Sequence, residues 1–209
     1  MKVEVWSDVV CPWCYIGKRR FERALEGFEG EVEVAWRSFE LNPGAPRTPE
    51  RALDEGLARK YGMSVAQARY MMDHVTRTAA DEGLAFDFGR AQGGNTLDAH
   101  RLLHLATERG LGAEMKERLL GAYFTEGRAI SDRDELAALA GEVGLDAEEV
   151  AEILAGDAFT DAVRRDELRA RELGVRGVPF FLIDERIGIE GAQPPELIRR
   201  GLVSAREPE

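Results

Sequence analysis

Residues 3–17 of the chain read VEVWSDVVCPWCYIG, and this stretch decides the fold. Val3, Val5, Val9 and Val10, which lie on either side of Trp6, indicate a short buried strand. Two cysteines follow, Cys11 and Cys14, with a proline and a tryptophan between them. From there to Gly30, apolar residues recur at the 3.6-residue spacing of a helix. The stretch therefore predicts a strand that leads through a cysteine pair directly into a helix.

The segments nearer the two ends of the chain predict the other strands of a sheet. Residues 31–39 alternate between apolar and charged side chains, as a strand does. The first two strands are joined by the helix that follows the cysteines. A strand–helix–strand unit with a connection this short predicts a parallel pair with a right-handed crossover. Residues 178–184 predict a buried strand, residues 187–190 its antiparallel partner, and residues 194–204 a final helix. The order is β-α-β at one end and β-β-α at the other.

The middle of the chain has a different character. Residues 41–49 contain three prolines and a glycine, which is the composition of a linker. The segments with helical spacing that follow are residues 50–60, 64–82, 96–109, 113–125, 132–143, 146–155 and 158–173. Asp132 and Asp146 each stand three residues before a glutamate, as in the capping boxes that begin helices. The sequence thus predicts helices only between the two ends.

Together these patterns predict one sheet domain interrupted by an insertion. We expect residues 1–45 and 174–209 to form the two parts of the sheet domain. We expect residues 46–173 to form an all-helical domain packed over the sheet edge near Cys11.

The composition excludes several classes of protein. The 209 residues are 44% hydrophobic and 32% charged, which is typical of a globular protein with a buried core. A formal net charge of −11 argues against nucleic acid or an anionic membrane as the main partner. Two cysteines are too few for a disulfide-stapled secreted domain. The first ten residues lack the apolar core of a signal peptide, and no segment has the ~20 apolar residues that span a bilayer. We therefore expect a cytoplasmic protein.

The cysteine pair carries the chemistry that the sequence indicates. Pro12 suits the first turn of a helix, because the amide hydrogen that it lacks has no partner there. The positive end of the helix dipole then favours a thiolate at Cys11, and Cys14 lies one turn further on, within reach of a disulfide. The alternatives for such a pair are half of a zinc site and a structural or inert role. The chain has no second cysteine pair, and its three histidines are distant in sequence, so a redox role is favoured.

Residues 7–17 resemble the active-site segment of the DsbA-like thioredoxin-fold proteins, and specifically their FrnE-like branch. The other segments that share this resemblance are residues 39–43, 95–102, 177–181 and 191–194. The resemblance implies an α/β protein with a thioredoxin-like fold (β-α-β … β-β-α) and a large all-helical insertion. It also implies a cis proline that faces the cysteine pair, a role that we assign to Pro179, with Val178 as the residue before it.

Two residues close to the cysteines are further site candidates. Asp8 lies three residues before Cys11 and is a candidate to relay a proton to or from Cys14, with the cap of a loop as the alternative role. Trp13 either offers the substrate a docking surface or shields Cys14.

Four more residues lie far from the cysteines in sequence. By resemblance to related glutathione-using isomerases, Asn95 is a candidate to face the cysteine site, and its alternative role is to cap the following helix. Gln193 is a candidate for substrate contact because it lies in one of the shared segments. His100 and His104 are four residues apart on a helix, but no glutamate follows His100, so the zinc-protease pattern fails and we expect no metal site.

The sequence predicts a thiol–disulfide oxidoreductase of the DsbA-like kind. Its predicted site is catalytic Cys11, Cys14, Pro179 and Asp8, with Trp13, Val178, Asn95 and Gln193 binding the substrate. The expected partners are disulfide-containing proteins or small thiols and a cellular reductant, with neither nucleic acid nor membrane. We expect no cofactor, and glutathione is a candidate co-substrate. In a reducing cytosol, reduction or repair of disulfides is favoured over bulk oxidative folding.

Two other functions remain open on the sequence. The first is a glutathione-dependent isomerase of the hydroxychromene-carboxylate or polyketide-pathway type. Those proteins resemble this chain but carry serine at the position of Cys11. The second is a non-catalytic binding module or holdase, for which an intact dithiol leaves only a secondary role.

Overall fold

The computed structural model describes residues 1–49 and 52–206. The chain forms two compact units. The sheet unit consists of Met1–Leu41 and Val163–Glu209, and the helical unit consists of Asn42–Ala162. The first two residues of the helix expected at 50–60, Glu50 and Arg51, lie outside the described residues.

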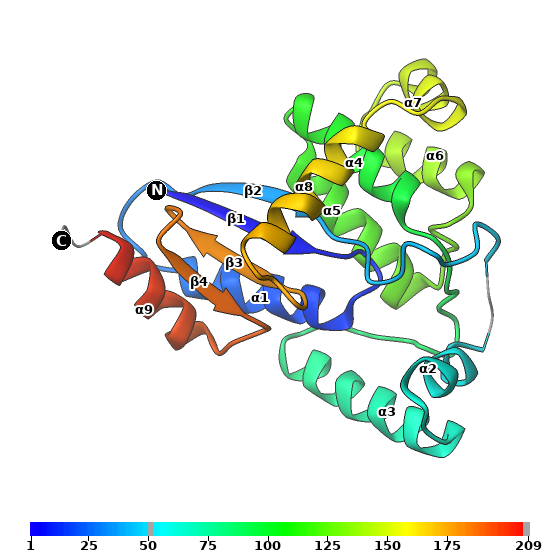
Figure 1. The fold of residues 1–209 in the computed structure, drawn as a ribbon, viewed down its shortest axis with the longest axis horizontal. Helices are drawn as coiled ribbons and strands as arrows, with labels where there is room; N and C mark the ends of the chain where they lie inside the picture. The colour runs from blue at the N-terminus through cyan, green and yellow to red at the C-terminus, as the bar shows by residue number, and fades with distance from the viewer. Residues whose placement is uncertain (50–51, 207–209) are drawn as a thin grey trace. The chain divides into compact units, whose positions relative to one another are not determined.

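A four-stranded sheet forms the centre of the sheet unit (Figure 1). The strands are β1 (Lys2–Ser7), β2 (Glu33–Ser38), β3 (Phe180–Ile183) and β4 (Ile187–Glu190), in the order β2-β1-β3-β4. β1 pairs with β2 in parallel and with β3 antiparallel, and β3 pairs antiparallel with β4. The predicted parallel pair and the predicted hairpin are both confirmed. β1 ends before the expected Val9 and Val10, because the chain turns at Asp8, whose carbonyl accepts a hydrogen bond from the amide of Cys11.

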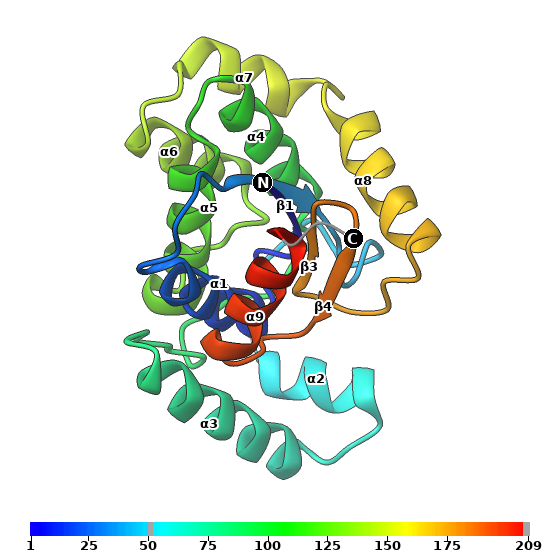
Figure 2. The same cartoon turned by 90° about the vertical axis from the view of Figure 1, so that its left-hand side faces the viewer.

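Alternation along the strands gives the sheet two different faces, and helices cover both of them (Figure 2). Val3, Val5 and Phe181 point to the face covered by α1 (Pro12–Leu25) and α9 (Pro195–Arg206), where they join a buried apolar core. Trp6 and Phe180 point to the opposite face, against α8 (Thr160–Glu172). The period of two in the sequence thus places two separate cores on the two sides of one sheet.

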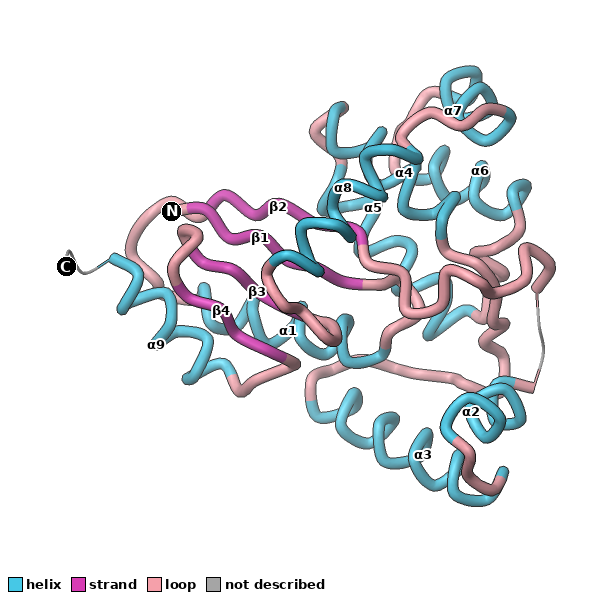
Figure 3. The backbone as a smooth tube through the Cα atoms, in the orientation of Figure 1, coloured by secondary structure: helices cyan, strands magenta, loops and turns pink. Residues whose placement is uncertain are grey.

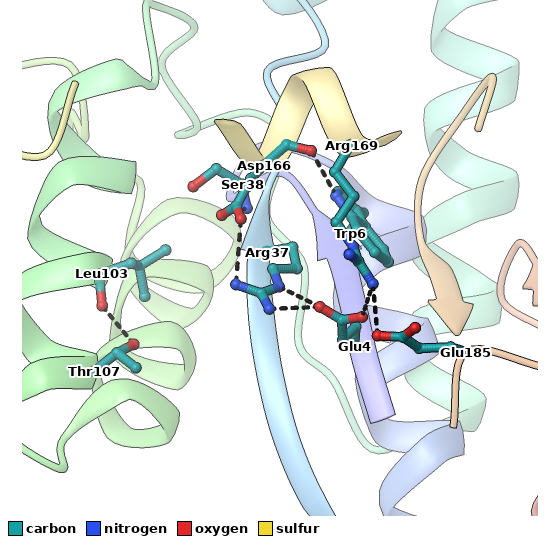
Figure 4. Close-up of polar contacts among 9 residues, drawn as sticks. All are labelled: Glu4, Trp6, Arg37, Ser38, Leu103, Thr107, Asp166, Arg169 and Glu185. Carbon is teal, nitrogen blue, oxygen red and sulfur yellow. Dashed lines mark hydrogen bonds and ion pairs between the residues drawn. The ribbon is translucent and has the colours of Figure 1, made fainter. Parts of the chain in front are cut away.

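Polar contacts tie α8 to the sheet (Figure 4). The indole Nε1 of Trp6 donates to the main-chain carbonyl of Asp166 at 2.9 Å. Glu4, on β1, is only 3% exposed. Its carboxylate accepts hydrogen bonds from Arg37 Nε at 2.8 Å and Arg169 Nη2 at 2.7 Å. Because a buried carboxylate is costly without such partners, these arginines fix β1, β2 and α8 to one another.

These contacts explain why the boundaries between the units differ from the expected ones. We expected the helical insertion to span residues 46–173, whereas the helical unit ends at Ala162 and begins at Asn42. Most of α8 therefore belongs to the sheet unit. Helical spacing identifies a helix and its apolar side, but it does not identify the element on which that side packs.

The helical unit consists of helices and the loops that join them, and none of its described residues joins the four-stranded sheet (Figure 3). Its helices are α2 (Leu53–Tyr61), α3 (Val65–Asp81), α4 (Leu97–Glu108), α5 (Gly112–Gly121), the π-helix η1 (Ala122–Glu126), α6 (Arg133–Glu142) and α7 (Ala147–Ala155). Asp132 and Asp146 cap α6 and α7, as predicted. The structure also has a complete capping box at α3, formed by Ser64 and Gln67, which we did not predict.

Candidate active site

Cys11 stands at the N-terminus of α1, as its N-cap residue. Its backbone is extended, with φ −91° and ψ 112°, and Pro12 follows as the first helical residue. The amide of Cys11 donates to the carbonyl of Asp8 at 3.3 Å, and the amide of Cys14 donates to the carbonyl of Cys11 at 3.0 Å. The chain therefore turns into the helix at the first cysteine, where the aligned peptide dipoles present their positive end.

Exposure does not distinguish the two cysteines. A cysteine at a helix N-terminus is expected to be more exposed than one within the first turn, and here both are buried, with Cys11 4% and Cys14 2% exposed. The two side chains are not joined in a disulfide. What distinguishes them is position, because Cys11 is the cap of the helix and Cys14 lies within its first turn.

The Val178–Pro179 segment lies beside the first cysteine. The Sγ of Cys11 donates to the main-chain oxygen of Val178 at 3.5 Å. The peptide bond between Val178 and Pro179 is cis, which the family resemblance implied. Pro179 packs closely on α1 at Gly17, where an added Cβ would come within 2.8 Å of the proline Cγ. Glycine at this position therefore leaves the room that the proline ring occupies.

The loop after β4 is held on the same part of α1. Arg20 Nη1 donates to the main-chain oxygen of Ala192 at 2.6 Å. The amide of Gly191 donates to the oxygen of Pro179 at 2.8 Å. Gln193 folds back on its own turn, and its Nε2 donates to the oxygen of Glu190 at 2.8 Å. The expected site residue Gln193 is thus brought near Pro179 by the main chain.

Asp8 is fully buried and has a main-chain partner outside its own loop. Its Oδ2 accepts a hydrogen bond of 2.7 Å from the amide of Leu41, which follows β2. Its main-chain oxygen holds the amide of Cys11. Trp13, in contrast, is 37% exposed. The structure therefore places a buried carboxyl before the cysteine pair and an exposed indole within it.

Asn95 lies in the helical unit, where both ends of its side chain are engaged. Its Oδ1 accepts from the amide of Leu97 at 3.0 Å, and its Nδ2 donates to the oxygen of Pro43 at 3.1 Å. The first of these bonds is the capping contact that we considered as its alternative role. His100 is buried in α4, and His104 stacks on Phe159 with 6.2 Å between ring centroids.

Among residues 1–49 and 52–206, no three histidine, cysteine, aspartate or glutamate side chains are grouped as metal ligands. No helix in the same ranges is both long and apolar enough to cross a membrane.

The structure adds residues that sequence reasoning did not assign to the site. Gly17 and Arg20 hold the Pro179 and Ala192 segments, and the amide of Leu41 binds Asp8. A glycine inside a strong helical pattern is a signal for close packing, so Gly17 could have been found from the sequence. The amide of Leu41 gives no such signal, because every residue except proline has one.

The chain matches a family model and several solved structures. The model of the DSBA-like thioredoxin domain matches residues 2–203. The crystal structure of a probable DsbA oxidoreductase from Streptomyces coelicolor is 45% identical, with a TM-score of 0.94 over 100% of this chain and 92% of that chain.

Two more distant structures share the fold. Cytosolic disulfide reductase DsbM from Pseudomonas aeruginosa, solved with GSH, is 22% identical, with a TM-score of 0.69 over 98% of each chain. A 2-hydroxychromene-2-carboxylate isomerase is 17% identical, with a TM-score of 0.73 over 98% of this chain and 95% of that chain.

Proposed function

The chain belongs to the family of DSBA-like thioredoxin domains, and from this we propose that it is a thiol–disulfide oxidoreductase that works through Cys11 and Cys14. The observation that carries the proposal is the position of Cys11. It caps α1, and its sulfur lies 3.5 Å from the carbonyl of Val178, which precedes Pro179. A thiolate at a helix N-terminus is stabilised by the helix dipole and can act as a nucleophile.

The proposed reaction has two exchange steps. The Cys11 thiolate attacks one sulfur of a substrate disulfide, a mixed disulfide forms, and the other substrate sulfur leaves as a thiolate. Cys14 then loses its proton and attacks the Cys11 sulfur, which forms the Cys11–Cys14 disulfide and releases the second substrate thiolate. Two electrons pass from the dithiol to the substrate, and the two thiolates take up protons. Run backwards, the same steps donate a disulfide.

We assign supporting roles to three residues. Asp8 is fully buried in the loop whose carbonyl holds the Cys11 amide, and it exchanges a proton with Cys14. Pro179 has no amide hydrogen, so it offers no competing donor beside the reactive sulfur. Trp13 is exposed at the cysteine pair and provides an apolar surface on which a substrate docks.

We propose that the protein works in the cytoplasm in the reducing direction, with a thiol such as glutathione restoring the dithiol. A reducing cytosol favours this direction. The cytosolic disulfide reductase DsbM, which shares the fold, was solved with GSH, and this likeness makes glutathione the first reductant to test.

Variants of the two cysteines test the proposal. Cys14→Ala is expected to stop after the first step and accumulate a mixed disulfide at Cys11, detected by mass spectrometry after acid quenching. Cys11→Ser is expected to abolish reduction of a model disulfide. A Cys11→Ser variant that reduces the disulfide at the wild-type rate would refute the proposal.

The same variants separate the isomerase alternative. A glutathione-dependent isomerase has no resolving step, so Cys14→Ala would retain full turnover. The oxidoreductase requires both sulfurs for a complete cycle, and Cys14→Ala would lose it. Trapped adducts that contain protein substrates would also favour exchange.

A further inference from the structure

Three main-chain amides between residues 38 and 41 donate to carboxylates. The amide of Ser38 donates to Asp166 Oδ2 at 2.9 Å, and the amide of Glu40 donates to Glu167 Oε1 at 3.2 Å. The third amide, that of Leu41, donates to Asp8 Oδ2 at 2.7 Å. Two of the acceptors lie on α8, and the third lies just before the cysteine pair. This short segment therefore connects α8 with the buried carboxylate of the candidate site.

Helix α8 holds residue 40 by both its backbone and its side chain. Glu167 accepts the Glu40 amide with Oε1, and its Oε2 accepts from Arg164 Nη1 at 2.7 Å. The same Arg164 nitrogen donates to Glu40 Oε2 at 2.5 Å. The Glu40 side chain is 0% exposed, so its negative charge needs this cation. We name Glu40, Arg164 and Glu167 the α8 clamp.

We propose that the α8 clamp positions the Leu41 amide for the Asp8 carboxylate and thereby controls the rate at which Cys14 resolves the mixed disulfide. The Leu41 amide belongs to the planar peptide unit that starts at the carbonyl of Glu40. Anchoring residue 40 at its amide and its side chain leaves that unit little freedom to turn. The donor is thus held where it meets Asp8 at 2.7 Å.

The hydrogen bond from Leu41 matters because Asp8 is fully buried. A donor at this distance stabilises a negative carboxylate and fixes its direction. In the proposed step, the Asp8 carboxylate that this hydrogen bond orients accepts the proton of Cys14 as the Cys14 sulfur attacks Cys11. The Cys11–Cys14 bond forms, the bond from Cys11 to the substrate breaks, and the substrate leaves as a thiolate. Loss of the clamp is expected to slow this step and to spare the first attack, which needs no proton from Cys14.

This inference rests on the proposed function, and two neighbouring carboxylates on α8 provide the test. Glu167→Ala removes the acceptor at residue 40. Asp166→Ala is the control at the neighbouring residue, because it removes the acceptor of Ser38, three residues before Leu41, together with a 3.4 Å contact to Arg37. Rapid mixing with a model disulfide and acid quenching separates formation of the mixed disulfide from its resolution. We expect Glu167→Ala to slow resolution about tenfold, a part of what general acid–base catalysis contributes, with formation within about twofold of wild type. Asp166→Ala should leave the ratio of the two rates unchanged.

Conservative variants keep the test independent of folding. Glu167→Gln retains an Oε1 acceptor for the Glu40 amide and is expected to restore most of the resolution rate. Thermal melting of each variant shows whether it is folded. If Glu167→Ala does not fold, Arg164→Gln removes the cation of the clamp and is expected to slow resolution in the same selective way.

Two kinds of outcome would overturn the inference. In the first, Glu167→Ala and Asp166→Ala change both steps by the same factor. In the second, Glu167→Ala and Arg164→Gln change neither step. If the wild-type protein forms no mixed disulfide at all, the proposed function fails first. The clamp is then judged by the amide resonance of Leu41 in ¹H–¹⁵N spectra. That resonance should move in Glu167→Ala and in Asp8→Asn, and should stay in place in Asp166→Ala.

Discussion

Replacing Gly17 by alanine tests the contact between α1 and Pro179, on which the shape of the candidate site depends. The added Cβ would lie 2.8 Å from the Cγ of Pro179 and 3.5 Å from the Cβ of Ala192. Carbon atoms attract each other best at about 3.5–4.0 Å, so the first distance is repulsive. The proline ring is fixed to its own backbone and cannot turn away as a long side chain would. Either α1 or the Val178–Pro179 segment has to move.

Two opposing effects determine how much Gly17→Ala changes the free energy of unfolding. Overpacking of a close contact costs about 1–3 kcal/mol. Alanine is favoured over glycine inside a helix by roughly 0.5–1 kcal/mol. We therefore expect Gly17→Ala to lower the free energy of unfolding by about 1–2 kcal/mol. For a protein of this size that corresponds to roughly 2–8 °C in Tm.

Urea unfolding provides the assay, and Gly141→Ala is the control. Gly141 lies in α6, and an added Cβ there meets nothing within 4 Å. That variant should be more stable than wild type by about 0.4–1 kcal/mol, because alanine reduces the freedom of the unfolded chain. We also expect Gly17→Ala, but not Gly141→Ala, to exchange disulfides more slowly. If Gly17→Ala is as stable and as active as Gly141→Ala, the argument that Pro179 needs a glycine on α1 is refuted.

Two further predictions concern the helical unit. Burial raises the pKa of the Asp98 carboxyl, but hydrogen bonds from Arg101 and Arg133 outweigh this and hold it below its ordinary 3.8. The stability that this carboxylate contributes is therefore present above about pH 3.8 and lost as the pH falls through the lowered pKa. We expect the midpoint of urea unfolding to depend less on pH in Asp98→Asn than in wild type between pH 5 and pH 2. Asp132→Ala and Asp146→Ala each remove an N-cap that accepts two amide hydrogen bonds, and each should cost about 1 kcal/mol by urea unfolding. A cap variant as stable as wild type would contradict the capping role.

The elements could be predicted from the sequence because their patterns are local. Alternation identified the strands, the 3.6-residue period identified the helices, and the caps at Asp132 and Asp146 marked two helix starts. No local pattern could show that α8 belongs to the sheet unit. Its contacts with the sheet depend on Arg37, Glu4 and Asp166, which come from three separate parts of the chain. Charged residues such as these normally indicate a solvated face, so no sequence pattern indicated that this helix docks on a sheet.

The candidate site was predictable to a different degree for each residue. Cys11 could be placed at a helix N-terminus from the residues around it, because a strand pattern ends and a helix pattern begins there. Val178 and Pro179 could be placed beside it only through the family resemblance, since no local pattern brings two distant segments together. The partner of Asp8 could not be predicted at all, because a main-chain amide is common to almost every residue.

Much of the candidate site is held through main-chain atoms, and this affects which substitutions are informative. The carbonyl of Val178 meets the Cys11 sulfur, the amide of Leu41 meets Asp8, and the carbonyl of Ala192 meets Arg20. Replacing Val178 or Leu41 leaves those main-chain groups in the chain, so such variants mainly report on packing. The position of each group depends instead on side chains that anchor its backbone, such as Arg20 for the 191–194 loop and Glu167 for residue 40. Variants at these anchors are therefore the ones that move a main-chain partner relative to the cysteine pair while leaving both sulfurs in the chain.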